Sequence, residues 1–250
     1  MIIDDHVHVH EWSFNADQPE YRVDYVIKVM DEVGIDKSII MDSLAYIGVD
    51  QTKSNDETRK AVEAYPDRLI GFANIKPQLG IGICRAEIDR TVGGWNFRGI
   101  KLHAAVDQYP ANSEAIVYPI IETAIRYDVP VWFHTGHQPY ATPTLLGNLA
   151  RAFPEAKIIC GHMGQGMFYD AILAARRHPS LYLEISQQGE HSFEAACREI
   201  GADRLIFGSD APYGHPGGIK RMVEAAALSD EEKRQILGGN IAHLVGLDTL

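Results

Sequence analysis

Two histidines near the start of the chain have the spacing of metal ligands. His6 and His8 are separated by one residue, within the run DHVHVH at positions 5–10. If this run is a β-strand, residues two apart point to the same face, so the two imidazoles lie side by side. Such a pair at a strand end is half of a site for a divalent transition metal. Taken alone, the pattern fits equally well with a polar strand end that carries histidines by chance.

Further residues that could bind a metal or act as an acid or base follow, each close to the end of a short apolar segment. Imidazoles and a carboxylate together suit Zn²⁺, with Mn²⁺, Fe or Co as alternatives. A catalytic site of this kind keeps one coordination position open for water and lowers the pKa of that water to about 7. The candidates are Lys101, His103, His134, His162 and Asp210.

The segments that must position these residues alternate regularly between strand-like and helix-like patterns. Short apolar runs rich in β-branched residues predict strands, and amphipathic stretches at helical spacing lie between them. One expected helix begins at Ser113, as its N-cap, and runs to Tyr127, while 230–237 and 241–245 are expected to form closing helices. The candidate strands are 2–8, 38–42, 69–74, 99–103, 129–134, 156–161, 181–186 and 204–209.

Alternating strands and helices imply a parallel sheet with helical crossovers. Eight such units in 250 residues match the size of a (β/α)8 barrel, whereas a doubly wound open sheet is the alternative. An open sheet binds ligands mainly at one switch point, but a closed barrel brings all strand C-termini to one mouth. Because nearly every candidate strand ends in a polar residue, we predict one α/β domain over residues 1–250, a (β/α)8 TIM-type barrel with closing C-terminal helices.

Composition narrows the setting and the partners. The formal net charge of −11 argues against a nucleic-acid partner, which requires a basic face. The three cysteines form no disulfide framework, which favours a reducing, cytoplasmic location. No apolar stretch reaches the length of a membrane span, and the start of the chain lacks the pattern of a signal peptide. We therefore expect a small-molecule substrate. The protein could also form a homodimer.

Several short motifs occur together in a recognisable order. They are DHVH at 5–8, GIKLH at 99–103, FHTG at 133–136, GHMG at 161–164, FGSD at 207–210 and ILGGN at 236–240. Each is weak alone, but in this order and at barrel spacing they are specific. The chain resembles the amidohydrolase superfamily, in particular the amidohydrolase-related branch that includes decarboxylases, lactone hydrolases and hydratases.

The resemblance implies a role for each matching position. His6, His8, His134 and Asp210 correspond to metal ligands, and Asp210 would also take a proton from the metal-bound water. His162 corresponds to a histidine that lies beside the metal and acts as an acid or base or polarises the substrate carbonyl. One or two ions are compatible with the pattern.

Lys101 and His103 complete the set of site residues. In binuclear relatives a lysine at the position of Lys101 is carboxylated and bridges two metals, whereas in the mononuclear branch it is usually not a bridge, and the alternative for Lys101 is an ammonium paired with a carboxylate at the mouth. His103 lies on the same face as Lys101, where it would contact a second metal or the substrate.

The function expected from these roles is hydrolysis of a small ester, lactone or amide by a metal-activated water. The alternative is decarboxylation or hydration of a small carboxylated substrate with the same residues. Decarboxylation calls for a cation at the substrate carboxylate, for which Arg98, Arg221 and Lys101 are the candidates. Decarboxylases of this branch usually carry longer loop insertions, for which this chain has little room, so hydrolysis is favoured. An alternative outside the enzymes is a barrel that binds a metal or another ligand without catalysing a reaction.

Other polar residues near the strand ends have less specific interpretations. His10, His137 and His215 are expected to line a pocket or to be exposed rather than to bind metal. Simple alternation along the first strand places Asp4 on the same face as His6, at a deeper level, and directs Asp5 to the opposite face.

Overall fold

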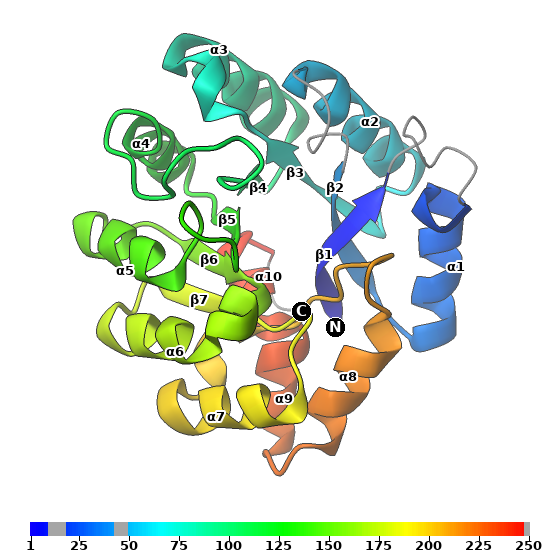
Figure 1. Cartoon of the computed structure of the whole chain (residues 1–250). Coiled ribbons are helices and arrows are strands. Elements are labelled where there is room, and N and C mark those ends of the chain that lie inside the picture. The colour runs from blue at the N-terminus through cyan, green and yellow to red at the C-terminus, as the bar shows by residue number, and fades with distance from the viewer. Residues whose placement is uncertain (10–18, 43–49, 248–250) are drawn as a thin grey trace.

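The computed structural model describes residues 1–9, 19–42 and 50–247. Its centre is an eight-stranded parallel sheet whose strands follow one another in chain order, β1 to β8 (Figure 1). This arrangement confirms the TIM-barrel fold. The strands are β1 (Ile3–Val9), β2 (Lys37–Asp42), β3 (Leu69–Asn74), β4 (Gly99–Leu102), β5 (Val131–His134), β6 (Ile158–Gly161), β7 (Leu181–Glu184) and β8 (Leu205–Ile206).

The barrel is nearly closed by hydrogen bonds between β1 and the chain that follows β8. The Asp5 amide donates to the Phe207 carbonyl at 3.0 Å, and the His8 amide donates to the Ala211 carbonyl at 2.7 Å. Between them, the Asp210 amide donates to the His6 carbonyl at 2.9 Å. Closure therefore brings the last candidate site residue directly against the first two.

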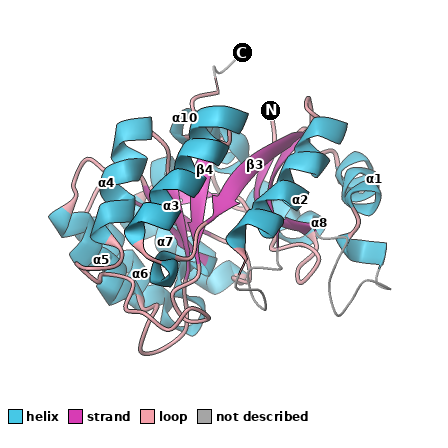
Figure 2. Cartoon of the chain, turned by 90° about the horizontal axis from the view of Figure 1, so that it is seen from above, coloured by secondary structure: helices cyan, strands magenta, loops and turns pink. Residues whose placement is uncertain are grey.

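Helices surround the sheet and occupy the crossovers between strands (Figure 2). Where the structure describes the chain, no helix is long and apolar enough to cross a membrane. The helices are α1 (Val23–Val33), α2 (Gln51–Ala64), α3 (Ile81–Ile88), α4 (Tyr118–Tyr127), α5 (Pro143–Ala152), α6 (Phe168–Arg177), α7 (Glu190–Ile200), α8 (Pro216–Ala225), α9 (Asp230–Arg234) and α10 (Asn240–Leu244), with 3₁₀ turns η1 (Pro19–Tyr21), η3 (Pro77–Leu79), η5 (His162–Met167) and η6 (Ala202–Arg204) and π turns η4 (Asp89–Gly94) and η7 (Gln235–Gly239).

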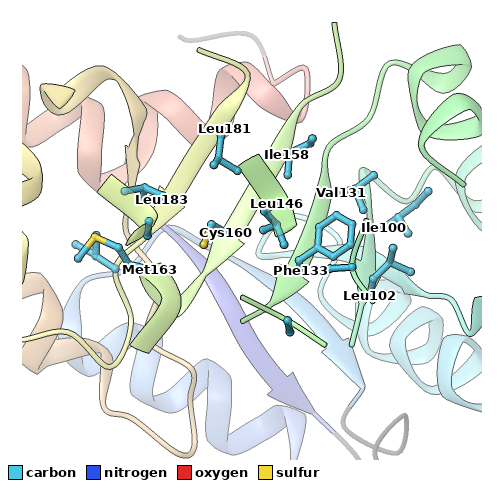
Figure 3. Packing of buried hydrophobic residues seen from close by; sticks show 14 of the residues in the cluster. Ile100, Leu102, Val131, Phe133, Leu146, Ile158, Cys160, Met163, Leu181 and Leu183 are labelled. Carbon is cyan, nitrogen blue, oxygen red and sulfur yellow. The ribbon is translucent and has the colours of Figure 1, made fainter. Parts of the chain in front are cut away.

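Alternate residues of the strands form two separate cores. Ile100, Phe133 and Leu183 point outward and pack against the helices, as Figure 3 shows. The inward positions near the start of the strands belong to a second cluster that includes Phe72 of β3 and Ile241 of α10. The closing helix α10 therefore plugs the barrel at the end where the strands begin, and leaves the opposite mouth for polar side chains.

Some boundaries differ from the sequence-based expectation for identifiable reasons. The helix expected from Ser113 begins only at Tyr118, because Pro119, which has no amide proton, occupies its first turn. The last strand ends at Ile206 rather than 209, because the Phe207 amide donates to the carbonyl of Ile236 in η7 instead of to a neighbouring strand.

The first strand departs from simple alternation. Its pairing with β2 changes register between Asp4 and Val7. As a result, Asp5 lies inside the barrel, where its Oδ2 accepts a hydrogen bond from the Trp132 indole at 2.9 Å. The expectation that Asp5 faces away is therefore wrong, because an irregularity of one residue breaks the period of two. Asp4 supports the neighbouring chain instead, with Oδ1 accepting from the Ser209 amide at 2.8 Å.

A glycine on β6 makes room for the largest side chain inside the barrel. A Cβ atom added to Gly161 would lie 2.0 Å from the ring of Trp132. The backbone of Gly161 itself, with φ −62° and ψ 142°, would accept any residue. The close approach to the indole, rather than backbone freedom, is thus what requires glycine here.

We expect Gly161→Ala to destabilise the protein by about 1–3 kcal/mol, since the overlap forces the indole or β6 to move. Denaturant unfolding measures the change. Gly82→Ala is the matched control, because Gly82 lies in α3 with open space around its added Cβ. The free energy of unfolding of the control should be unchanged or higher by up to about 1 kcal/mol. Equal effects of the two substitutions would refute the argument from crowding.

Candidate metal centre and active site

A cavity of about 490 Å³ opens at the mouth formed by the C-terminal ends of the strands. Its wall combines imidazoles with one carboxylate, an amide and small apolar groups. No arginine or lysine lines it among the described residues. The lining residues are His103, Ala105, Val106, His134, His137, Gln187, Asp210 and Tyr213.

Three predicted metal ligands lie together beside this cavity. Nε2 of His8 is 3.2 Å from Oδ1 of Asp210, and Nδ1 of His6 is 3.5 Å from the same oxygen. All three side chains are buried, and one ligand atom from each lies within 4.8 Å of the others. Barrel closure produces this cluster, because β1 supplies both histidines and the chain after β8 supplies the aspartate.

His134 offers a fourth ligand atom in a different way and lies outside this group of three. Its Nδ1 lies 3.1 Å from Nε2 of His162, so this side of the ring is already engaged. Its Nε2 is buried and has no hydrogen-bond partner in the described part of the chain. A buried ring nitrogen without a partner is costly unless something binds it. Together with the cluster around Asp210, this orphaned nitrogen fits a divalent cation at the base of the cavity.

His162 lies behind His134 and is not among the residues that line the cavity. It is fully buried, and burial lowers its pKa to about 3, so the imidazole is neutral. It forms a second possible ligand group with His6 and Glu184. In this arrangement His162 contacts the proposed ligand His134 rather than the space available to a substrate.

Asp210 is held in place by groups from both sides of the barrel mouth. Burial acts to raise its pKa, but the hydrogen bond and charge of His8, followed by the effects of His162 and Gln187, lower the pKa below its ordinary value. Gln187 donates to its second oxygen, Oδ2. The carboxylate is therefore ionised and is available as a metal ligand or as a proton acceptor.

The two residues considered for a second metal occupy distinct places. Nζ of Lys101 lies 3.2 Å from Nε2 of His6 and 3.3 Å above the ring of Trp132. Burial lowers the pKa of Lys101 to about 7. The ring of His103 stacks on that of His134, with centroids 3.9 Å apart, and lines the cavity. Lys101 thus supports His6 from below, whereas His103 faces the substrate space.

Glu184 and Gln187 are site residues that the sequence analysis misses. Glu184 occupies an inward position of β7, fully buried, and hydrogen-bonds the backbone of His162 and Ser186. A charged residue two positions before Ser186 in an otherwise apolar segment was the available signal. Gln187 has none, since glutamine is ordinary in a loop.

The less specific candidates have mixed outcomes. His137 lines the cavity, with its ring centroid 4.9 Å from that of His134. His215 instead accepts a hydrogen bond from the Gly217 amide and caps α8. His10 lies outside the described residues.

Comparison with known proteins places the chain in a family. A family model described as amidohydrolase matches residues 3–247. The chain belongs to the amidohydrolase family. A curated relative within it is a gamma-resorcylate decarboxylase from Polaromonas sp., which is 25% identical over an alignment of 305 positions that covers 94% of this chain and 92% of the relative. A 2-keto-4-carboxy-3-hexenedioate hydratase from Sphingobium sp. is 23% identical and covers 74% of this chain and 68% of its own length.

Solved structures of the family share the fold over nearly the whole chain. A 2,6-dihydroxybenzoate decarboxylase from Rhizobium has a TM-score of 0.79 at 19% identity and covers 99% of both chains. A dihydroxybenzoic acid decarboxylase from Polaromonas sp., which was solved with manganese and the inhibitor 2-nitroresorcinol, has a TM-score of 0.81 at 20% identity, and covers 100% of this chain and 98% of that one.

These family relationships sharpen the expectations from sequence. They support an enzyme with a divalent metal and a small-molecule substrate. They do not confirm hydrolysis, and the decarboxylase and hydratase relatives support the alternative function better. The donor atoms led us to expect zinc first, but the related structure contains manganese, so the comparisons do not identify zinc as the metal.

His8→Ala should weaken Mn²⁺ binding by at least about 100-fold, because loss of groups that merely support ligands already costs roughly 10–100-fold. Electron paramagnetic resonance of free Mn²⁺ measures the affinity. His191→Ala, an exposed histidine of α7, should bind as the unchanged protein does. An unaltered affinity in a folded His8→Ala protein would remove His8 from the metal site.

Proposed function

We propose that this chain is a metal-dependent decarboxylase of a small hydroxylated aromatic carboxylate. The observation that carries the proposal is the match to a gamma-resorcylate decarboxylase over 94% of this chain and 92% of that enzyme. The lining of the cavity supports it, because stacked imidazoles and the ring of Tyr213 suit a planar substrate. The volume of about 490 Å³ leaves ample room for one benzoate-sized molecule.

The residues that would hold the metal are His6, His8, His134 and Asp210. When bound, a divalent ion supplies a Lewis acid that can anchor a carboxylate and an adjacent hydroxyl oxygen. The cations considered at the sequence level do not line the cavity. Arg221 is 77% exposed on α8, and Arg98 lies just before β4, at the opposite end of the strand from the mouth. Substrate charge would therefore be met by the ion, while His103, whose pKa burial lowers well below its ordinary value, would offer a hydrogen bond rather than a charge.

Asp210 is the proposed proton carrier. In decarboxylation the bond to the carboxyl carbon breaks, carbon dioxide leaves, and the ring carbon takes a proton in its place. Asp210 is the only carboxylate that lines the cavity among the described residues. Its ionised form would accept a proton from a substrate hydroxyl and return it to the ring carbon, after which the phenolic oxygen recovers a proton from solvent.

His162 then takes a supporting role rather than the direct acid–base role expected from the sequence. Its Nε2 contacts His134, so it acts on the proposed metal ligand. His103 and His137 lie where a substrate would and are the proposed contacts to the ring and its oxygens. Hydration of a small unsaturated carboxylate is the second candidate, favoured by the hydratase relative.

The manganese-loaded protein should convert 2,6-dihydroxybenzoate or a related hydroxybenzoate into the corresponding phenol and carbon dioxide. Chromatography measures the phenol, and capture of the gas measures the carbon dioxide. Asp210→Asn should lower the turnover rate by about 10²–10⁴-fold at saturating metal, because it cannot carry the proton. Asp203→Asn, an exposed aspartate in η6, is the control and should keep full activity.

The metal content of each variant is measured alongside, so that loss of metal and loss of proton transfer are separated. Lactones, esters and unsaturated dicarboxylates complete the panel. Hydrolysis of a lactone or ester without carbon dioxide release from any carboxylate would contradict the proposal. Hydration alone would support the second candidate in its place.

A further inference from the structure

Behind His134, a continuous row of hydrogen-bonded side chains leads away from the cavity to a buried carboxylate. Nδ1 of His134 lies 3.1 Å from Nε2 of His162. Nδ1 of His162 lies 2.7 Å from the Ser186 hydroxyl, which in turn lies 2.9 Å from Oε2 of Glu184. The row crosses three successive parts of the barrel: His134 ends β5, His162 directly follows β6, Glu184 ends β7 and Ser186 is the second residue beyond β7.

The end of the row at Glu184 is fixed by the backbone. Oε2 of Glu184 accepts from the His162 amide at 2.8 Å, and Oε1 accepts from the Ser186 amide at 2.6 Å. Space for the carboxylate comes from Gly208, where an added Cβ would lie 2.4 Å from Oε1. The carboxylate therefore cannot turn away from the serine hydroxyl without breaking two backbone hydrogen bonds.

Burial raises the pKa of Glu184 to about 8, so its carboxylate is ionised above that pH or when a cation bound at His134 stabilises its charge. The ionised form gives the whole row one direction. A carboxylate only accepts hydrogen bonds, so the Ser186 hydroxyl donates to it and can only accept from Nδ1 of His162. Nε2 of His162 is then unprotonated and accepts from Nδ1 of His134. In a neutral imidazole one nitrogen carries the proton, so Nε2 of His134 is left with a lone pair.

This direction matches what the cavity requires. Nε2 of His134 is the buried nitrogen that has no hydrogen-bond partner among the described residues. A lone pair there can bind a cation, whereas a proton there would exclude one. The reverse direction, which begins from a protonated Glu184, would place a proton on that nitrogen.

We propose that Ser186 and Glu184 are positioning residues that hold His162 and His134 in the tautomer whose free Nε2 points to the metal. This rests on the metal site of the proposed function but not on the reaction catalysed there. Neither residue touches the cavity, so each acts through the two histidines. Second-sphere partners of this kind commonly set the tautomer of a ligating histidine.

The proposal is tested first by metal affinity. Ser186→Ala removes the link between His162 and Glu184, and Mn²⁺ should bind about 10–100-fold more weakly. Ser38→Ala is the matched control, since Ser38 is an equally buried serine of β2 whose hydroxyl has no partner among the described residues. Ser186→Thr keeps the hydroxyl and should restore most of the affinity. Equal affinities for Ser186→Ala and Ser38→Ala, with both proteins folded, would overturn the proposal.

The tautomer itself is measured by ¹⁵N nuclear magnetic resonance of the histidine rings in metal-free protein, with His162 assigned from a His162→Asn sample. At a pH above the raised pKa of Glu184, Nδ1 of His162 should be protonated in the unchanged protein, and Ser186→Ala should mix the two tautomers. A protonated Nε2 in the unchanged protein would overturn the proposal. Both measurements hold whichever reaction the enzyme catalyses, so failure of the decarboxylation assay leaves them intact.

Discussion

The cost of removing ionisable groups from water determines the charge states of the side chains around the mouth of this barrel. Burial lowers the pKa of Lys101 to about 7 and that of His162 to about 3, and it raises the pKa of Glu184 to about 8. Each shift disfavours the charged form, so these groups persist only where a partner compensates. The partners are one another, and the mouth is therefore one connected polar cluster in which a change to one member alters the protonation of its neighbours.

Trp132 separates this polar cluster from the apolar half of the barrel. Its indole donates to Asp5, lies beneath Lys101, and has its centroid 4.1 Å from that of His6. On the opposite side it belongs to the apolar cluster that α10 closes. A single wide side chain thus forms the floor of the site, which explains why the facing position on β6 is Gly161.

The sequence allows the fold to be predicted well because barrel alternation is a local property. The bounds of β3 agree with the expected 69–74, and three of the expected polar strand-end residues, His103, His134 and Asp210, do line one cavity. The structural details that the sequence does not predict depend on contacts between residues far apart in the chain. The register change between Asp4 and Val7 is set by pairing with β2, and the hydrogen bond that ends β8 is accepted by the Ile236 carbonyl in η7. A local pattern encodes neither. Glu184 does carry a local signal, a charge in an apolar strand, but its hydrogen bond from the distant His162 amide does not follow from any local pattern.

Binding the metal and choosing the substrate fall to different parts of the chain. His6, His8 and His134 lie on strands, and Asp210 is tied to β1 by its own amide, so the proposed ligands move with the rigid sheet. The remaining cavity wall comes from the segments after β4, β5, β7 and β8. Motifs on the strands therefore identify the family, while the proposed choice between hydrolysis, hydration and decarboxylation rests on those loops. The same separation explains why the resemblance in sequence predicts the metal site more sharply than the reaction.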